Sequence, residues 1–296
     1  MRAPGSQRVR LGDISFLNCA PIRWGLADSG AAHHLDLTSA PPERLAAQLL
    51  AGELDISPVS LVRYLRHAGD LALLPGVAIG SDGPVRSCHI VSHGPLHDLD
   101  HEPVVVSGAS RSTALLARMV LEDAIGVRPR YRTLPPDVLR EELVRGLPSA
   151  RAAVVIGDDA LRVWAAPPAG LTVHDTGALW HDWTGLPMVF AVWAVRRTFA
   201  REHPDAVRAV SAALTDAVRR ARAQPLRVAA AAAREARGAG AGTFDVPVLL
   251  DYFRTLDHTL GERQLAAVQE FSARAAARGE VPAPVPARIP IHGGRR

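Results

Sequence analysis

Short hydrophobic runs alternate with amphipathic stretches along the N-terminal part of the chain. Runs typical of strands are Arg8–Phe16, Leu35–Ser39, Leu54–Ser57, Leu71–Ile79 and Val85–Val91. Helical patterns lie between them, at Ala20–Ala27, at Pro41–Gly52 and from a Ser57-Pro58 cap to about His67. This alternation predicts an α/β fold with a mostly parallel sheet covered by helices.

The same rhythm restarts after the polar stretch His93–Pro103. It predicts strands at Val104–Ser107, Tyr131–Leu134 and Ala152–Gly157, and helices at Ser110–Ile125 and Pro136–Gly146. The apolar run Leu186–Val195 predicts a central strand. Everything after Thr198 has helical patterns, which are Phe199–Ala223, Pro225–Arg237, Val246–Leu256 and Glu262–Arg278, before an irregular tail over Val281–Arg296.

Two α/β units followed by helices predict a two-lobed protein with a cleft between the lobes. Residues 1–91 and 196–296 would form lobe one, residues 92–195 would form lobe two, and the C-terminal helices would pack on lobe one. Ligands of open α/β sheets bind beyond the carboxyl ends of the strands, where helix N-termini present free N–H groups. The residues of the cleft are therefore expected at strand ends.

Length and composition agree with this organisation and exclude several functions. At ~150 residues per domain, 296 residues form two domains or one large one. There is no lysine, so all 34 basic residues are arginine, which excludes a lysine Schiff base and a Walker-type phosphate loop. A net charge of +4 spread along the chain and an aromatic content of 5% argue against nucleic acid as a partner.

Nothing in the sequence indicates a membrane protein or a framework of disulfide bonds. The apolar runs are far shorter than the ~20 residues of a membrane span, and the N-terminus lacks the apolar segment of a secretory signal, so we expect a cytoplasmic protein. Cys19 and Cys88 are expected to be free thiols. His89, His93, His97 and His101 recur every four residues, but Gly94 and Pro95 interrupt any helix there, so we expect neither a metal site nor a cofactor.

Four segments fall at predicted strand ends, and the most informative is Ser107–Thr113 (SGASRST). Its hydroxyls and backbone N–H groups suit a carboxylate or phosphate, although an ordinary helix N-cap explains them as well. The same two readings apply to Ser57–Ser60. Asn18 follows the first strand, where its amide could donate to an anion or a leaving oxygen or could simply stabilise a turn. The remaining segment is Gly157-Asp158-Asp159. From the residues alone, the chain is a small-anion binder.

The same positions carry a family resemblance. Phe16–Pro21 (FLNCAP) and Gly52–Ser60 (GELDISPVS) resemble segments of the chorismate dehydratases of the futalosine route to menaquinone. Further similar segments are Ser81–Ser87, Ser110–Thr113, Ile156–Leu161, and Trp183–Pro187 with Phe190, Ala191 and Trp193. The sister enzymes that make 1,4-dihydroxy-6-naphthoate match less well, because their opening has P-N-D where this chain has LNCAP.

The resemblance implies a periplasmic-binding-protein-like type II fold that dehydrates chorismate without metal or cofactor. It assigns Asn18 and Ser87 to the reaction centre, with the substrate's own carboxylate suggested as the base. Binding of the substrate carboxylates is expected at Ser60, Ser110, Arg111, Ser112, Thr113, Gly157 and Asp158. Arg111 stands where the family has a small residue, so it either pairs with a substrate carboxylate or lies in solvent. A non-catalytic solute-binding protein with this fold is the alternative. The oligomeric state is left open.

Overall fold

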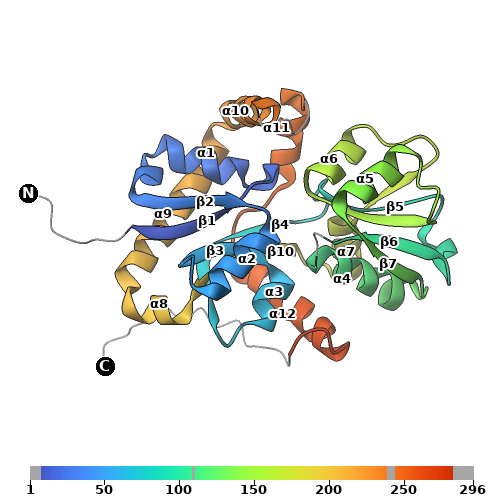
Figure 1. Cartoon of the computed structure of the whole chain (residues 1–296), viewed down its shortest axis with the longest axis horizontal. Coiled ribbons are helices and arrows are strands. Elements are labelled where there is room, and N and C mark those ends of the chain that lie inside the picture. Colours follow the sequence, from blue (N-terminus) through green and yellow to red (C-terminus); the bar gives the residue numbers. More distant parts are fainter. Residues whose placement is uncertain (1–7, 109–110, 239–243, 283–296) are drawn as a thin grey trace, which may run out of the picture.

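The computed structural model describes residues 8–108, 111–238 and 244–282, and these form two mixed sheets. The first sheet has the order β2-β1-β3-β10-β4 and the second has the order β7-β6-β8-β5-β9 (Figure 1). The strands of the first sheet are β1 (Val9–Ile14), β2 (Leu35–Ala40), β3 (Ile56–Ser60), β4 (Leu71–Ser81) and β10 (Met188–Arg196). Those of the second are β5 (Cys88–Ser92), β6 (Pro103–Ser107), β7 (Arg130–Leu134), β8 (Ala152–Ile156) and β9 (Thr172–Asp175). The predicted α/β class is confirmed.

In each sheet four strands run in one direction and one strand runs opposite to them. In the first sheet β1 runs parallel to β2 and β3, whereas β10 runs antiparallel to β3 and β4. In the second, β6 runs parallel to β7 and β8, whereas β5 runs antiparallel to β8 and β9. We call the two halves built on these sheets lobe one and lobe two. Since β5 belongs wholly to the second sheet and β10 wholly to the first, the chain crosses at residues 82–87 and 185–187, before the expected positions near 92 and 195.

Helices cover both sheets. Those of lobe one are α1 (Ala20–Asp28), α2 (Pro42–Ala51), α3 (Leu61–Arg66), α8 (Arg197–Glu202), α9 (Pro204–Ala223), α10 (Pro225–Gly238), α11 (Val246–Thr255) and α12 (Glu262–Ala277). Those of lobe two are α4 (Ser112–Met119), α5 (Pro136–Val144), α6 (Gly157–Ala165) and α7 (Thr176–Thr184). Leu17–Cys19, Ala31–His34 and Leu96–Leu99 are 3-10 turns, and a π-helical segment, Val120–Ile125, continues α4. Among the described residues, no helix is both long and apolar enough to cross a membrane.

The core of lobe one extends into lobe two. The largest cluster of buried side chains joins the first sheet to α4 and α7. Within it Trp180 of α7 packs against Phe271 of α12, with ring centroids 5.9 Å apart. Two smaller clusters cover the two faces of the second sheet. The last helix therefore packs on lobe one, as expected, and also holds the two lobes together.

Two predicted helix boundaries are wrong, each because of a proline. Ser57 and Pro58 do not cap a helix but lie inside β3, where Pro58 pairs with Trp193 of β10. The paired register between β3 and β1 includes only Ile56, so the N–H that proline lacks is not needed on that edge. The single helix predicted over Phe199–Ala223 is two helices, because Pro204 begins α9 and cannot continue α8.

Gly25 lets α1 pack directly on the backbone of α9. A Cβ atom added at Gly25 would lie 2.2 Å from the carbonyl oxygen of Ala217. Gly25→Ala therefore forces the helices apart, and we expect it to lower the free energy of unfolding by about 3 kcal/mol, the upper end for overpacking. Urea denaturation measures the loss. Gly69→Ala is the matched control, since its Cβ would meet nothing within 4 Å. Equal stability of the two variants would contradict the close approach.

Candidate functional site

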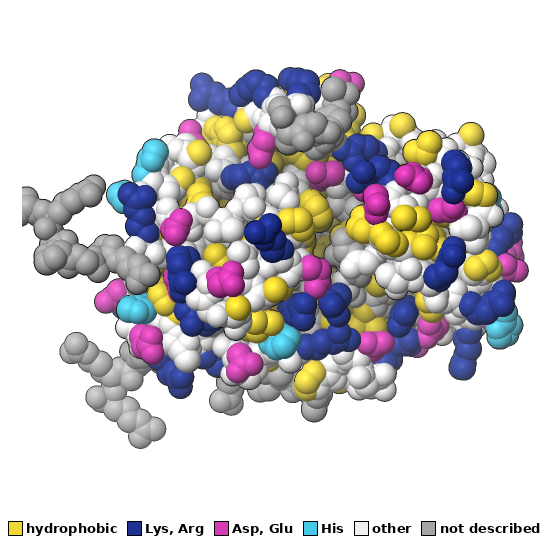
Figure 2. All heavy atoms as spheres, viewed as in Figure 1, with side chains coloured by type: hydrophobic (Ala, Val, Ile, Leu, Met, Phe, Trp, Pro, Cys, Tyr) yellow, Lys and Arg dark blue, Asp and Glu magenta, His cyan; other side chains and the backbone are white. Residues whose placement is uncertain are grey.

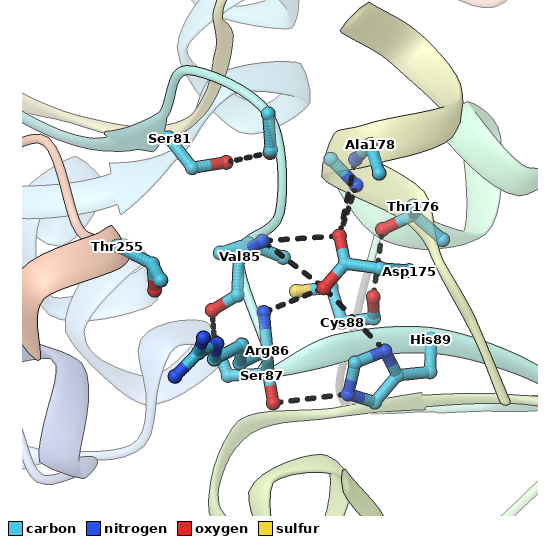
Figure 3. Close-up of polar contacts among 12 residues, drawn as sticks. Ser81, Val85, Arg86, Ser87, Cys88, His89, Asp175, Thr176, Ala178 and Thr255 are labelled. Carbon is cyan, nitrogen blue, oxygen red and sulfur yellow. Dashed lines mark hydrogen bonds and ion pairs between the residues drawn. The ribbon is translucent and has the colours of Figure 1, made fainter. Parts of the chain in front are cut away.

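The crossing from the first sheet to the second presents Ser87 at the boundary of the lobes. The crossing turns sharply, with Gly83 and Arg86 in left-handed backbone conformations at φ 96° and φ 62°. Asp175 holds this turn from the other lobe, because its carboxylate accepts the N–H of Val85 at 3.0 Å and that of Arg86 at 2.7 Å (Figure 3). The same carboxylate caps α7 by accepting N–H groups of Gly177 at 2.9 Å and Ala178 at 3.1 Å.

The side chain of His89 also holds the turn, through a hydrogen bond to the backbone of Arg86. Its ring is fully buried, and Nε2 lies 2.9 Å from the carbonyl oxygen of Arg86 (Figure 3). A carbonyl oxygen can only accept, so Nε2 carries the proton. Burial lowers the pKa of His89, which favours the neutral ring beside Asp175. Arg86 itself pairs with Asp251 and stacks over the ring of Trp164 at 4.4 Å. The strained residue before Ser87 is thus fixed from several sides.

Removal of the Asp175 carboxylate tests this support. Asp175→Ala leaves the N–H groups of Val85, Arg86, Gly177 and Ala178 without their acceptor, so we expect a loss of about 2–4 kcal/mol in the free energy of unfolding. Urea denaturation gives this loss. Asp182→Ala on the same helix is the control, because its side chain is 79% exposed. Similar unfolding midpoints for both variants would show that Asp175 does not hold the crossing.

Ser87 lies in a buried group of polar side chains from three parts of the chain. Its hydroxyl lies 3.5 Å from the carbonyl oxygen of Val85, and it is close enough to the hydroxyl of Tyr252 and the thiol of Cys88 to lower the pKa of each. The hydroxyl of Thr113 in turn donates to that thiol at 3.4 Å. We call Ser87, Cys88, Thr113 and Tyr252 the Ser87 cluster. It brings together two of the expected site residues, Ser87 and Thr113.

The other two members of the Ser87 cluster were not predicted as site residues. Tyr252 lies within an apolar stretch of α11 and is only 1% exposed, so its sequence pattern is that of a core residue. Burial raises the pKa of Tyr252 far above its ordinary value and raises the pKa of Cys88 to about 12. Both groups therefore stay protonated and can donate hydrogen bonds. Cys19 and Cys88 are free thiols, as predicted.

Asn18 occupies the loop after β1, opposite lobe two. Its Oδ1 is buried with no hydrogen-bond donor among the described residues, and its backbone oxygen lies 2.8 Å from Nε2 of His258. The neighbouring N–H of Leu17 donates to Asp158 at 3.0 Å, and burial raises the pKa of Asp158. A buried amide oxygen without a donor is costly unless a ligand supplies one.

Gly157 connects the Asn18 loop to Ser87. It has a left-handed backbone, and a Cβ atom added to it would lie 3.2 Å from the ring of Phe16. Its N–H donates to the carbonyl oxygen of Ser87 at 2.8 Å. The loop of Asn18, the start of α6 with Asp158, and the Ser87 crossing therefore meet in one place. Hydrophobic side chains lie on both sides of the line where the two halves of the surface meet (Figure 2).

The remaining predicted residues lie at the contact of α3 with α4. Ser60 accepts the N–H of Arg63 at 3.3 Å, and the buried Ser112 accepts the N–H of Val62 at 3.0 Å. These two N–H groups are already bonded to the serine oxygens, so an anion here would be bound by the serine O–H groups and not by the N–H groups of α3. Arg111 is 46% exposed and pairs at 3.2 Å with Glu43 of α2, in the other lobe, and its part in substrate binding stays a prediction. Ser110 lies outside the described residues.

Metal ligands do not cluster in the part of the chain that the structure describes. No group of three or more His, Cys, Asp or Glu side chains there could hold an ion. His89 is buried in β5, whereas His97 and His101 are 74% and 80% exposed. The polar groups of the site are therefore an amide, hydroxyls, a neutral thiol and the buried carboxyl of Asp158, and such groups can orient a ligand through hydrogen bonds.

Comparison with solved structures gives the fold, because the sequence identities are low. A crystal structure from Archaeoglobus fulgidus covers 93% of this chain and 99% of its own, with a TM-score of 0.74 and 16% identity. The periplasmic aliphatic sulphonate binding protein of Escherichia coli covers 99% of this chain and 94% of its own, with a TM-score of 0.70 and 17% identity. The protein thus has a periplasmic-binding-protein-like fold.

Comparison of sequences gives the family. A chorismate dehydratase of Thermus thermophilus is 32% identical over 258 residues, which are 82% of this chain and 86% of that protein. A 1,4-dihydroxy-6-naphtoate synthase of the same organism is 29% identical over 62% of this chain and 61% of its own length. The family model described as menaquinone biosynthesis matches residues 9–277, which include the Asn18 loop, the Ser87 cluster and Asp158. The chain therefore belongs to the menaquinone biosynthesis family.

Proposed function

We propose that the protein is a chorismate dehydratase, a hydro-lyase that converts chorismate to 3-[(1-carboxyvinyl)oxy]benzoate and water. The observation that carries the proposal is the 32% identity to a chorismate dehydratase over 82% of this chain. The synthase is similar over only 62% of the chain, and the solute-binding proteins share the fold at low identity. We also propose a cytoplasmic location, because the proposed reaction is a biosynthetic step on a metabolic intermediate and not transport of a solute.

The chemistry of chorismate makes few demands on the protein. The proton at C3 is acidified through the ring carboxylate, and loss of the C4 hydroxyl gives an aromatic ring. The protein must hold the substrate in a reactive conformation, stabilise developing charge and assist the proton transfer. The substrate's enolpyruvyl carboxylate serves as the base in this proposal.

Asn18 and Ser87 are the proposed catalytic residues. The amide of Asn18 supplies both donors and an acceptor without adding charge, so it can bond the leaving C4 hydroxyl or the enolpyruvyl carboxylate. Ser87 offers a hydroxyl beside the hydroxyl of Tyr252 and the thiol of Cys88, and in this proposal these two neighbours orient it. Because these neighbours are neutral, they leave the dianionic substrate without a repelling charge.

Substrate binding is proposed at the contact of the lobes, where the described residues Ser60, Ser112, Thr113, Gly157 and Asp158 lie. Ser87 is only 3% exposed, and Leu17, Val62 and Phe16 contact the opposite lobe directly. Chorismate therefore requires the lobes to separate before it reaches Ser87, and a hinge motion of this kind is common in two-lobed binding folds. The residues between the sheets, 82–87 and 185–187, provide the hinge.

Mass spectrometry of chorismate incubated with the purified protein tests the proposal. We expect loss of one water from the substrate, at the same rate before and after treatment with EDTA. Chorismate that binds but stays unchanged would instead support a solute-binding protein. Conversion that stops on dialysis against EDTA and returns with zinc or magnesium would contradict the proposed chemistry.

A further inference from the structure

A cavity lies in lobe one, between α1, α9, α10 and α11. It has a volume of about 430 Å³, within the ~300–1,000 Å³ of small-molecule sites. Its wall is mainly apolar and includes Val218 of α9 with Leu250 and Phe253 of α11. The proposed chorismate site, in contrast, lies where the two lobes meet. The cavity is thus separate from the Ser87 cluster, although Tyr252 belongs to the same helix as Leu250 and Phe253.

The polar side chains of this cavity are basic. Arg222 and Arg254 line it together with His258, and none of the described lining residues is acidic. Arg222 forms an ion pair with Asp257, to whose carboxylate it donates a hydrogen bond at 3.2 Å. Arg254 is exposed and has no ion pair or hydrogen bond with another described residue. An apolar wall with an uncompensated arginine at its edge suits a ligand with an apolar body and an anionic head.

His258 connects the cavity to the proposed active site. Its ring lines the cavity, is 4% exposed, and holds the backbone oxygen of Asn18 through Nε2 at 2.8 Å. The chain around it is fixed, because its carbonyl oxygen accepts the N–H of Ala78 at 3.2 Å and Asp257 pairs with Gly80. Because the backbone of His258 is held in place, a ligand that rotates the ring within the cavity changes its hydrogen bond to the Asn18 loop.

We propose that the cavity is a second ligand site, which takes an aromatic monocarboxylate. The aromatic ring lies against Val218, Leu250 and Phe253, and the carboxylate binds Arg254 and Arg222. Occupancy changes the position of Asn18 through His258 and so lowers turnover. This effect on turnover rests on the proposed function, whereas the binding itself does not.

Calorimetric titration with 2-naphthoate tests the binding. We expect saturable binding to the wild type, and an affinity at least tenfold lower for Arg254→Gln, because a hydrogen bond to a charged group is lost. The neutral analogue 2-naphthalenemethanol should bind both proteins equally. Arg234→Gln is the matched control, since Arg234 is exposed on α10 and does not line the cavity. Leu250→Trp places a larger side chain in the cavity and should abolish binding of both compounds. Its unfolding temperature should stay near that of the wild type, which shows that the variant is folded.

Several results would overturn the site. The first is that 2-naphthoate does not bind at millimolar concentration. The second is that Arg254→Gln and Arg234→Gln bind it with equal affinity. The third is that Arg254→Gln weakens binding of the neutral analogue as much as binding of 2-naphthoate.

In the dehydration assay we expect 2-naphthoate to lower kcat without raising the KM for chorismate, and Arg254→Gln to remove this inhibition while keeping the basal rate. Competitive inhibition that Arg254→Gln leaves intact would place 2-naphthoate in the chorismate site. If 2-naphthoate binds but kcat does not change, the coupling through His258 is wrong. If the protein binds 2-naphthoate but leaves chorismate unchanged, the proposed function fails while the second ligand site stands.

Discussion

Asn18→Asp is expected to keep the fold and to abolish turnover of chorismate. The replacement is nearly isosteric but places a carboxylate where Oδ1 is already buried without a donor. A negative charge there repels a dianionic substrate in a poorly solvated site. It also removes the donor N–H that would bond the departing hydroxyl or the enolpyruvyl carboxylate.

Asn18→Ala separates the loss of the amide from the gain of charge. We expect kcat to fall by about 10²-fold or more, the usual loss for one preorganised donor, with a smaller change in KM. Gln269→Glu is the matched control for Asn18→Asp, because it makes the same change from amide to carboxylate at an exposed position of α12. Steady-state kinetics and urea denaturation give the two readouts. Near-native kcat with only a raised KM would make Asn18 a positioning residue.

Ser87→Ala is expected to lower kcat by about 10²-fold, because the hydroxyl is a preorganised donor at the proposed reaction centre. Tyr252→Phe removes the hydroxyl that orients Ser87 and should lower kcat by about tenfold, with KM nearly unchanged. Tyr252 acts through Ser87, so it is a positioning residue. The double variant should therefore be no slower than Ser87→Ala alone.

Tyr64→Phe controls for the loss of a buried tyrosine hydroxyl. Tyr64 is 4% exposed on α3 and does not belong to the Ser87 cluster. Its replacement should leave kcat unchanged. Additive losses in the double variant of Ser87 and Tyr252 would contradict the coupling of the two hydroxyls, and a full rate in Ser87→Ala would remove Ser87 from the catalytic step.

The elements predicted best have local signals that tertiary contacts do not override. The helix over Pro41–Gly52 has proline at its start and a left-handed glycine at its end, and it forms as α2 with a left-handed Gly52. The apolar run after Leu186 forms β10, which is buried almost throughout and pairs on both edges. The strand before Asn18 was also predicted, which placed this residue at the contact of the lobes.

The elements that were missed depend on contacts between distant residues. No hydrophobic periodicity marks β9 or α7, and the start of α7 is fixed by Asp175, which also holds Val85 and Arg86 about ninety residues earlier. Ser112 has the sequence context of an anion-binding hydroxyl, yet its partner is the N–H of Val62 in the other lobe. Tyr252 belongs to the Ser87 cluster only because α11 returns to lobe one beside the crossing. Sequence patterns report burial and local turns, but they do not report which buried hydroxyls meet.

Proton NMR of chorismate during incubation with the purified protein tests the central claim most directly, because it reports which bonds change. The dehydratase account predicts aromatic ring protons that appear as the ring C4 proton signal of chorismate disappears, while the enolpyruvyl methylene signals persist in the product. Asn18→Asp should give an unchanged spectrum. Release of free pyruvate, or an unchanged wild-type spectrum at high protein concentration, would contradict the account.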